Sequence, residues 1–216
     1  MNKLVALSIL LLSTQLVFAQ LNKPVAAKLD SIYSDDQKYR MQFDSMMNKF
    51  GLQSKELHSL IVLMNQQDSI NVVKVTTLLD KYGWLGADSI GTKGNYTLFL
   101  VIQHGNQAIQ EKYLPMLQAA VKKGNAKGSE LALLEDRVLL GQGKMQLYGS
   151  QISMDNQTQQ YYVSPLADPE NVDKRRAAVG LEPLAAYVKD WQIKWDVAQY
   201  KKDLPKYIEL EKLIIK

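Results

Sequence analysis

The sequence contains no cysteine and only two histidines, and these absences exclude several kinds of protein. Without cysteine the chain forms no disulfide, no thiolate nucleophile, no thiolate zinc or iron–sulfur site, and no lipid-anchored N-terminal cysteine. His58 and His104 are 46 positions apart, which excludes an HExxH zinc helix and a three-histidine metal site. The sequence therefore predicts no metal site, although one histidine plus carboxylates is a possible divalent-cation set. It leaves any cofactor unknown.

The N-terminal segment carries a single charge and only a short apolar run. Lys3 is the one charged residue before Ala19, and the apolar run from Leu4 to Leu12 is followed by three polar residues. A spanning helix needs about 20 apolar residues, whereas a shorter run ending in Val17-Phe18-Ala19 is typical of a secretory signal peptide. We expect residues 1–19 to be a signal peptide cleaved near Ala19, and the protein to be periplasmic or secreted. An uncleaved membrane anchor is the alternative.

The remaining chain has the composition of a folded domain. Hydrophobic residues make up 46% of the sequence and charged residues 22%, which is ordinary globular usage. Residues 174–216 carry 10 basic and 6 acidic groups. This basic excess indicates either nucleic-acid binding or a solvated helical surface, and export together with the interspersed acids favours the surface. We expect no nucleic-acid partner and no membrane span after signal removal.

Helical periodicity dominates the sequence, so we predict a mainly α fold: one multi-helix domain over residues 20–216 with one β-hairpin near residues 145–164. Apolar residues at helical spacing predict one helix from Pro24 to Phe50, capped by Gly51. Ser129 and Asp168 are predicted N-caps. Asp68 is either a further N-cap, which we favour, or, with Asn71 three residues later, a second polar pair on a helix. Pro115, Pro183 and Pro205 are predicted helix starts. Further helices are predicted at residues 56–64, 69–83, 95–103, 107–113, 130–140 and 169–180.

Two polar residues interrupt these apolar patterns. Asp36 occupies a position within the apolar stripe of the first helix, with Arg40 one turn later. Burial of a carboxylate costs several kcal/mol unless it is paired, so Asp36 predicts either a structural ion pair or a polar cavity shared with Gln37 and Arg40. His104 ends an apolar segment. It is either a hydrogen-bonded core residue or a general acid or base near neutral pH.

Further candidate side chains follow in the second half of the chain. Asp136 and Arg137 are adjacent on an apolar helix, so at most one of them is expected to face inward. The last group comprises amide, phenol and guanidinium groups that could hold a substrate or remain solvated: Gln146, Tyr148, Gln151, Arg175 and Arg176. An arginine in this group could bind a carboxylate or phosphate through two parallel hydrogen bonds.

The order and number of these motifs resemble the bacterial domain of unknown function 6624 family. The resemblance spans about residues 30–187, which leaves a C-terminal helical extension, and it implies no established reaction. Two positions depart from the family pattern: Leu85 stands where proline is usual, and Asn106 where an acidic residue is common. The motifs that carry the resemblance are Asp36-Gln37-x-x-Arg40, Asp68-x-x-Asn71, Tyr82-Gly83-Trp84, Gln103-His104, Asp136-Arg137, Gln146-x-Tyr148-Gly149-x-Gln151, Asp168-Pro169, Asp173-x-Arg175-Arg176 and Gly180-Leu181.

Two functional hypotheses follow. In the first, the protein is a hydrolase or transferase acting on a small-molecule or cell-envelope ligand, with His104 as acid or base and Asp36 or Asp136 orienting it. Arg40, Gln37 and the amide, phenol and guanidinium group of residues 146–176 would hold the substrate. In the second, the protein is a non-catalytic binding or interaction module, and the same polar set is a buried network that fixes helix packing. Solvent access to His104 distinguishes the two.

Overall fold

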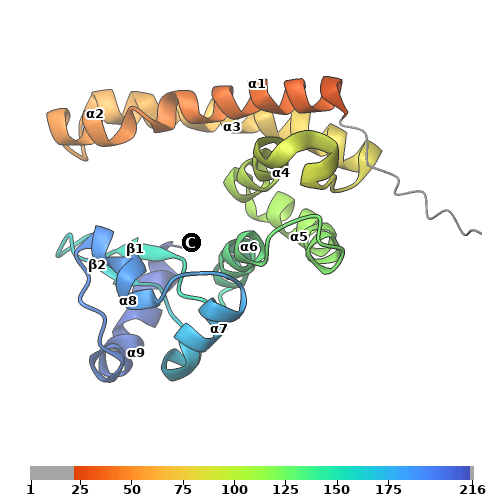
Figure 1. Ribbon diagram of the computed structural model, residues 1–216. Helices are drawn as coiled ribbons and strands as arrows, with labels where there is room; N and C mark the ends of the chain where they lie inside the picture. Colours follow the sequence, from red (N-terminus) through yellow and green to blue (C-terminus); the bar gives the residue numbers. More distant parts are fainter. Residues whose placement is uncertain (1–21, 215–216) are drawn as a thin grey trace, which may run out of the picture.

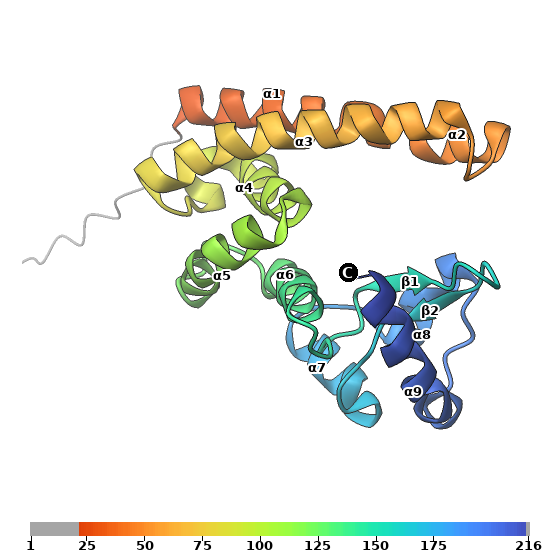
Figure 2. The same ribbon diagram turned by 180° about the vertical axis from the view of Figure 1, so that it is seen from behind.

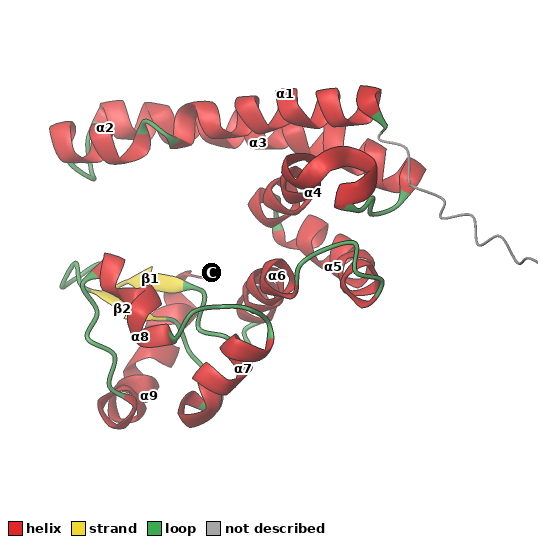
Figure 3. Ribbon diagram, in the orientation of Figure 1, coloured by secondary structure: helices red, strands yellow, loops and turns green. Residues whose placement is uncertain are grey.

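The structure is a computed structural model that describes residues 22–214, and the predicted signal peptide lies outside this range. Figure 3 shows helices throughout and two short strands, so the predicted mainly α fold with one hairpin is confirmed. None of the described helices is long and apolar enough to cross a membrane. The elements are α1 (Lys23–Arg40), α2 (Phe43–Phe50), α3 (Lys55–Tyr82), α4 (Ala87–His104), α5 (Gln107–Lys122), α6 (Gly128–Gly141), β1 (Ile152–Met154), β2 (Tyr161–Val163), η1 (Pro169–Asn171), α7 (Val172–Ala178), α8 (Leu184–Tyr187), η2 (Val188–Trp191) and α9 (Val197–Ile214).

The chain forms a helical part followed by a smaller mixed part. Helices α1 and α2 lie along the long helix α3, and α4 packs against α1 and α3 (Figures 1 and 2). Helices α5 and α6 pack together and lead to the hairpin, α7, α8 and α9. Helix α4 therefore lies against both the preceding helix α3 and the N-terminal helix α1.

Each part has its own apolar core. The first is formed by buried side chains of α1, α3, α4, α5 and α6, with Leu29, Leu98 and Leu117 almost fully buried. The second is formed around Val163, Leu166 and Leu184 beneath the hairpin. Burial of apolar surface is the main stabilising contribution to folding, so these two clusters fix where the polar side chains between and beside them can lie.

The first predicted helix is two helices, and the next two predicted helices are one. The carbonyl of Lys38 accepts a hydrogen bond from the Gln42 side chain at 2.7 Å, while the Gln42 backbone N–H donates to Tyr39. This competition ends α1, and α2 follows up to the predicted cap at Gly51. In contrast, α3 continues through Asp68 without a break. The predicted N-cap role of Asp68 is therefore wrong.

Four proline and cap predictions also fail. Pro115 and Pro205 lie inside α5 and α9 instead of opening helices, and both are on exposed helix faces where the lost backbone donor leaves a carbonyl near solvent. Helix α6 starts before Ser129, which makes no capping bond. Asp168 precedes Pro169 as predicted, but its carboxylate pairs with Arg175 instead of capping the backbone.

The hairpin is short, and the loop before it is held by a buried carboxylate. Strands β1 and β2 are antiparallel, with Ile152 opposite Val163. Gly149 has φ +66°, and a side chain there would meet Leu184 at 3.1 Å, so glycine allows the loop to turn against α8. Asp136 is fully buried and accepts backbone N–H groups of Leu147, Tyr148 and Ser150 at 2.7–3.2 Å.

We predict that Asp136→Asn destabilises the protein by about 3 kcal/mol, because the new amide NH₂ faces backbone N–H donors and leaves some of them unpaired. Urea unfolding at pH 7 measures the effect. The matched control is Glu135→Gln, which alters the neighbouring half-buried residue that accepts a bond from Gln118. Equal unfolding midpoints for Asp136→Asn and the wild type would show that the loop does not depend on this carboxylate.

Candidate functional site

The first part of the site is the carboxylate of Asp36, which is buried where α1 meets α4. The Asp36 residue is 1% exposed. One of its oxygens lies 3.0 Å from Nδ1 of His104, and the other accepts a hydrogen bond from the Gln37 side chain at 2.7 Å. The apolar stripe of α1 carries Asp36 into this position, since its neighbours Ile32 and Leu29 are both core residues. Asp36 thus replaces an apolar side chain in the core.

Arg40 connects the same carboxylate to a third helix. Its guanidinium donates to the carboxylate of Asp68 on α3 at 2.7 Å and to the backbone carbonyl of Asp36 at 3.2 Å. A guanidinium nitrogen also lies 3.9 Å from the Asp36 carboxylate. Residues from α1, α3 and α4 therefore form one cluster, the Asp36 cluster, which consists of Asp36, Gln37, Arg40, Asp68 and His104.

Opposing effects act on the pKa of Asp36. Burial raises this pKa, but the hydrogen bond and charge of His104, the charge of Arg40 and the bond from Gln37 lower it, and the net pKa shift is downward. Asp36 is therefore an ionised acceptor at neutral pH, and Nδ1 of His104 carries the hydrogen that it accepts. This arrangement leaves Nε2 as the basic nitrogen of a neutral His104.

His104 is open to solvent on one side. It lines a hollow of about 450 Å³ together with Asp68, Asn65, Val72 and Ile109, which come from α3 and the start of α5. Its side chain is 16% exposed, and no hydrogen bond within residues 22–214 uses its Nε2. The hollow satisfies the criterion of solvent access to the histidine.

Two polar atoms beside the cluster lack partners. One carboxylate oxygen of Asp68 and the amide nitrogen of Asn71 are buried without a hydrogen bond. Buried polar groups are nearly always paired in proteins. These two atoms are therefore exceptions among the described residues.

Asp36, Asp68 and His104 could also hold a divalent cation, because they offer ligand atoms within 4.8 Å of one another. Oxygen and imidazole ligands suit several divalent metals. However, Arg40 already supplies a positive charge at 2.7 Å from Asp68, and a cation there would have to displace or adjoin it. Arg40 offsets one of the two carboxylate charges of the Asp36 cluster, and we derive no step through a metal.

The other predicted site residues form a second set around residues 146–151. Gln146 is fully buried, and its amide group bonds the backbones of Gln151 and Ser164. The Gln151 amide nitrogen donates to the Ser150 hydroxyl. Within residues 22–214 no hydrogen bond or ion pair joins this set to the Asp36 cluster. Two carboxylates were predicted to orient His104. Asp136 instead binds the backbone of this loop, and Asp36 is the one in contact with His104.

The two predicted anion-binding arginines are also engaged by the protein. Arg175 donates to the backbone carbonyls of Leu147, Ala167 and Asp168 and to the Asp168 carboxylate. Arg176 is 1% exposed and donates to the carbonyls of Tyr148 and Glu182, with its guanidinium 4.8 Å from the Tyr187 ring centre. The guanidinium N–H groups of both arginines therefore bind the backbone of residues 147–148 to neighbouring segments.

Sequence reasoning missed the role of Asp68 and gave no role to Arg137. Asp68 was read as a helix cap because three polar residues precede it, whereas it is the ion-pair partner of Arg40 across two helices. Spacing within one helix carries no information about a contact between residues 28 positions apart. The Asp68-x-x-Asn71 motif was the signal that could have identified this pair of positions.

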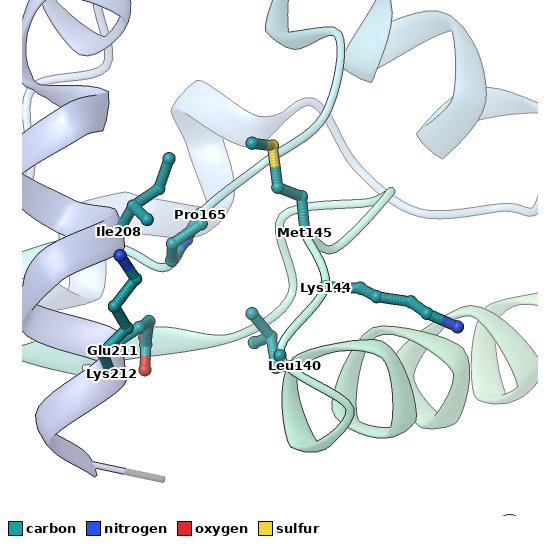
Figure 4. Close-up of a pocket in the computed structure, with 8 residues that line it drawn as sticks. Leu140, Lys144, Met145, Pro165, Ile208, Glu211 and Lys212 are labelled. Carbon is teal, nitrogen blue, oxygen red and sulfur yellow. The ribbon is translucent and has the colours of Figure 1, made fainter.

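A separate pocket lies far along the sequence from the Asp36 cluster. Figure 4 shows it between the end of α6 and α9, with Leu140, Met145, Pro165 and Ile208 around an apolar space of about 100 Å³. Its lining includes none of the residues of the Asp36 cluster. We assign no chemistry to it.

The fold and the site define a mainly helical protein in which a buried aspartate contacts a histidine and an arginine beside a surface hollow. The chain belongs to the family of unknown function DUF6624, whose sequence model matches residues 28–197. Searches of curated proteins and of solved structures found no match. The family membership confirms the resemblance seen in the sequence, and it supplies no reaction.

The structure explains one departure from the family pattern. Asn106 is the N-cap of α5, where its side-chain oxygen accepts the N–H of Ile109 at 3.1 Å. Aspartate and asparagine are nearly equivalent N-caps. An acidic residue at this position would serve the same cap, and the His104–carboxylate contact does not depend on it because Asp36 provides the carboxylate.

We predict that Asp36→Asn lowers the stability at pH 7 by about 3 kcal/mol, since it leaves Gln37 and His104 without their ionised buried acceptor. Because the folded pKa of Asp36 lies below its ordinary value of 3.8, its carboxylate stabilises the fold above that value and loses this effect as the pH falls through the folded pKa. The wild type should therefore lose more stability than the variant between pH 5 and pH 3. Denaturant unfolding across this pH range measures the difference.

Asp35→Asn is the matched control for this substitution. Asp35 is the preceding residue and forms an exposed ion pair with Lys74, so its loss should change stability by at most about 1 kcal/mol. The same pH dependence in the wild type and Asp36→Asn would contradict the assignment of an ionised Asp36.

Proposed function

We propose that the protein is an exported hydrolase or transferase in which His104 moves the proton and Asp36 orients it. The observation that supports this proposal is the contact of 3.0 Å between Nδ1 of His104 and the buried Asp36 carboxylate, in a histidine that also lines an open hollow. A histidine whose second nitrogen is fixed by a carboxylate is a common general base in proteins.

The chemistry follows from the two nitrogens of the ring. Nε2 takes a proton from a water molecule or from the hydroxyl of an acceptor as that oxygen attacks an ester-type centre. The imidazolium that forms is stabilised through Nδ1–H by the Asp36 carboxylate. The same proton then passes from Nε2 to the leaving oxygen, which restores the neutral histidine. Attack by water makes the reaction a hydrolysis, and attack by a hydroxyl makes it a transfer.

Asp68 and Asn65 are suited to binding the substrate next to His104, because both line the hollow. A substrate with hydroxyl or amide groups would bond to their carboxylate and amide atoms. A polar small molecule or a cell-envelope component has this character.

A second candidate is a non-catalytic module in which the cluster fixes helix packing. The observation that favours it is the nearly complete pairing of Asp36, which holds α1 and α4 together through bonds to Gln37 and His104. Such a network can specify a core without chemistry. The two candidates differ in whether loss of His104 affects a reaction or only the fold.

We predict that His104→Gln lowers kcat/KM by roughly 10²- to 10⁴-fold, which is the usual contribution of a general base. Rates of hydrolysis of p-nitrophenyl acetate and p-nitrophenyl phosphate by the purified mature protein measure the effect. His58→Gln is the control, because His58 is an exposed histidine on α3. Equal rates for His104→Gln, His58→Gln and the wild type would reject the enzymatic role.

Export supplies the setting for this activity and has its own test. We predict that the full chain expressed in a Gram-negative host yields a periplasmic or secreted product beginning at Gln20. N-terminal sequencing and intact mass measure this directly. A substitution of Ala19 by Arg should block cleavage and leave Met1 at the N-terminus. A wild-type product that retains Met1 and stays with the membrane would support the uncleaved anchor instead.

A further inference from the structure

Arg137 differs from the other three arginines of the chain in having no assigned partner. Arg40 is paired with two aspartates, and Arg175 and Arg176 donate to the backbone carbonyls described above. Arg137 is half-buried on α6, its Nε is buried without a hydrogen-bond partner, and no salt bridge within residues 22–214 involves it. Its charge is therefore unneutralised by the described chain.

The nearest sequence neighbour does not provide the missing counter-ion. Asp136 accepts the backbone N–H groups of the loop at 147–150 and is fully buried. Consecutive residues on a helix point about 100° apart, so the guanidinium of Arg137 lies on a different face from this carboxylate. Asp136 is thus occupied, and Arg137 remains without an acid.

Burial makes the missing counter-ion of Arg137 unfavourable. It lowers the pKa of the Arg137 guanidinium, which nevertheless stays protonated. A half-buried cation without a counter-ion is unfavourable unless an anion joins it.

The chemistry of the free donors indicates the kind of ligand. A guanidinium presents its N–H donors in a planar fork that matches the oxygens of a carboxylate or a phosphate. The unpaired Nε of Arg137 is one such donor.

We propose that Arg137 binds an anionic ligand that carries a carboxylate or a phosphate group. The anion replaces the missing counter-ion of Arg137. The proposal does not depend on the catalytic role of His104, so each can be tested without the other.

The test measures binding of inorganic phosphate and of acetate to the mature protein by calorimetry and by thermal unfolding, at constant ionic strength set with sodium chloride. We expect saturable binding of at least one anion, which raises the melting temperature as occupancy increases. Arg137→Met should weaken that binding by about tenfold or more. Arg137→Lys, which keeps the charge but loses the fork, should bind with intermediate affinity.

The stability of the unliganded variants separates a binding role from a structural one. Because Arg137 has no partner to lose, replacement by methionine of similar length should leave the melting temperature unchanged or higher. A fall of about 5 °C or more would assign Arg137 to the fold and overturn the proposal. Equal anion affinity in Arg137→Met and the wild type, or no saturable binding of either anion to the wild type, would also overturn it.

Two further variants complete the design. Lys28→Ala removes one exposed charge from α1 and should bind the anions as the wild type does. His104→Gln should keep anion binding within about twofold, since the anion contacts arginine and not imidazole. Anion binding that persists while His104→Gln shows unchanged hydrolysis would reject the catalytic role and leave the anion site in place. Loss of hydrolysis in His104→Gln, without saturable anion binding to the wild type, would reject the anion site alone.

Discussion

The buried carboxylate of Asp36 is the interaction on which the arrangement of α1, α3 and α4 depends. A carboxylate in an apolar core is strongly unfavourable unless donors surround it. Its partners come from its own helix and from α4, and Arg40 extends the set to α3. Each partner is useful to the fold only if the three helices meet at one point, so the charge selects one packing arrangement over others that would bury the same apolar area.

The same requirement operates in the second part of the chain with a different solution. There Asp136 and Arg176 are buried, and each is satisfied chiefly by backbone groups. Backbone donors and acceptors are fixed in direction once the loop is closed, which makes such a charge a structural element with little capacity left for a ligand. His104 and Arg137 are different in kind, because each keeps a hydrogen-bonding nitrogen that the described chain does not use.

The sequence was sufficient to predict the helical class, the hairpin and the anomalous position of Asp36, because these features are encoded at short range. Periodicity gives the face of a helix directly, and a carboxylate on an apolar face is visible without a structure. The points at which helices continue or end were not predictable. Helix α3 runs through Asp68, whereas α1 ends at Arg40 because the side chain of Gln42 donates to a backbone carbonyl. Local competition of this kind has no signature in hydrophobic spacing.

The partners of the charged side chains were not predictable for a related reason. Arg175, Arg176 and Asp136 were reasonable candidates for a site because charged residues in a folded domain need partners, yet the partners they found are backbone groups from loops elsewhere in the chain. Residue type alone does not distinguish a charge that the backbone satisfies from one that it leaves free. Arg137 shows the distinction, since it adjoins Asp136 in sequence and differs from it in having no partner. Unsatisfied buried capacity, which is a property of three-dimensional structure, therefore identifies sites that composition and motif order cannot separate from the framework.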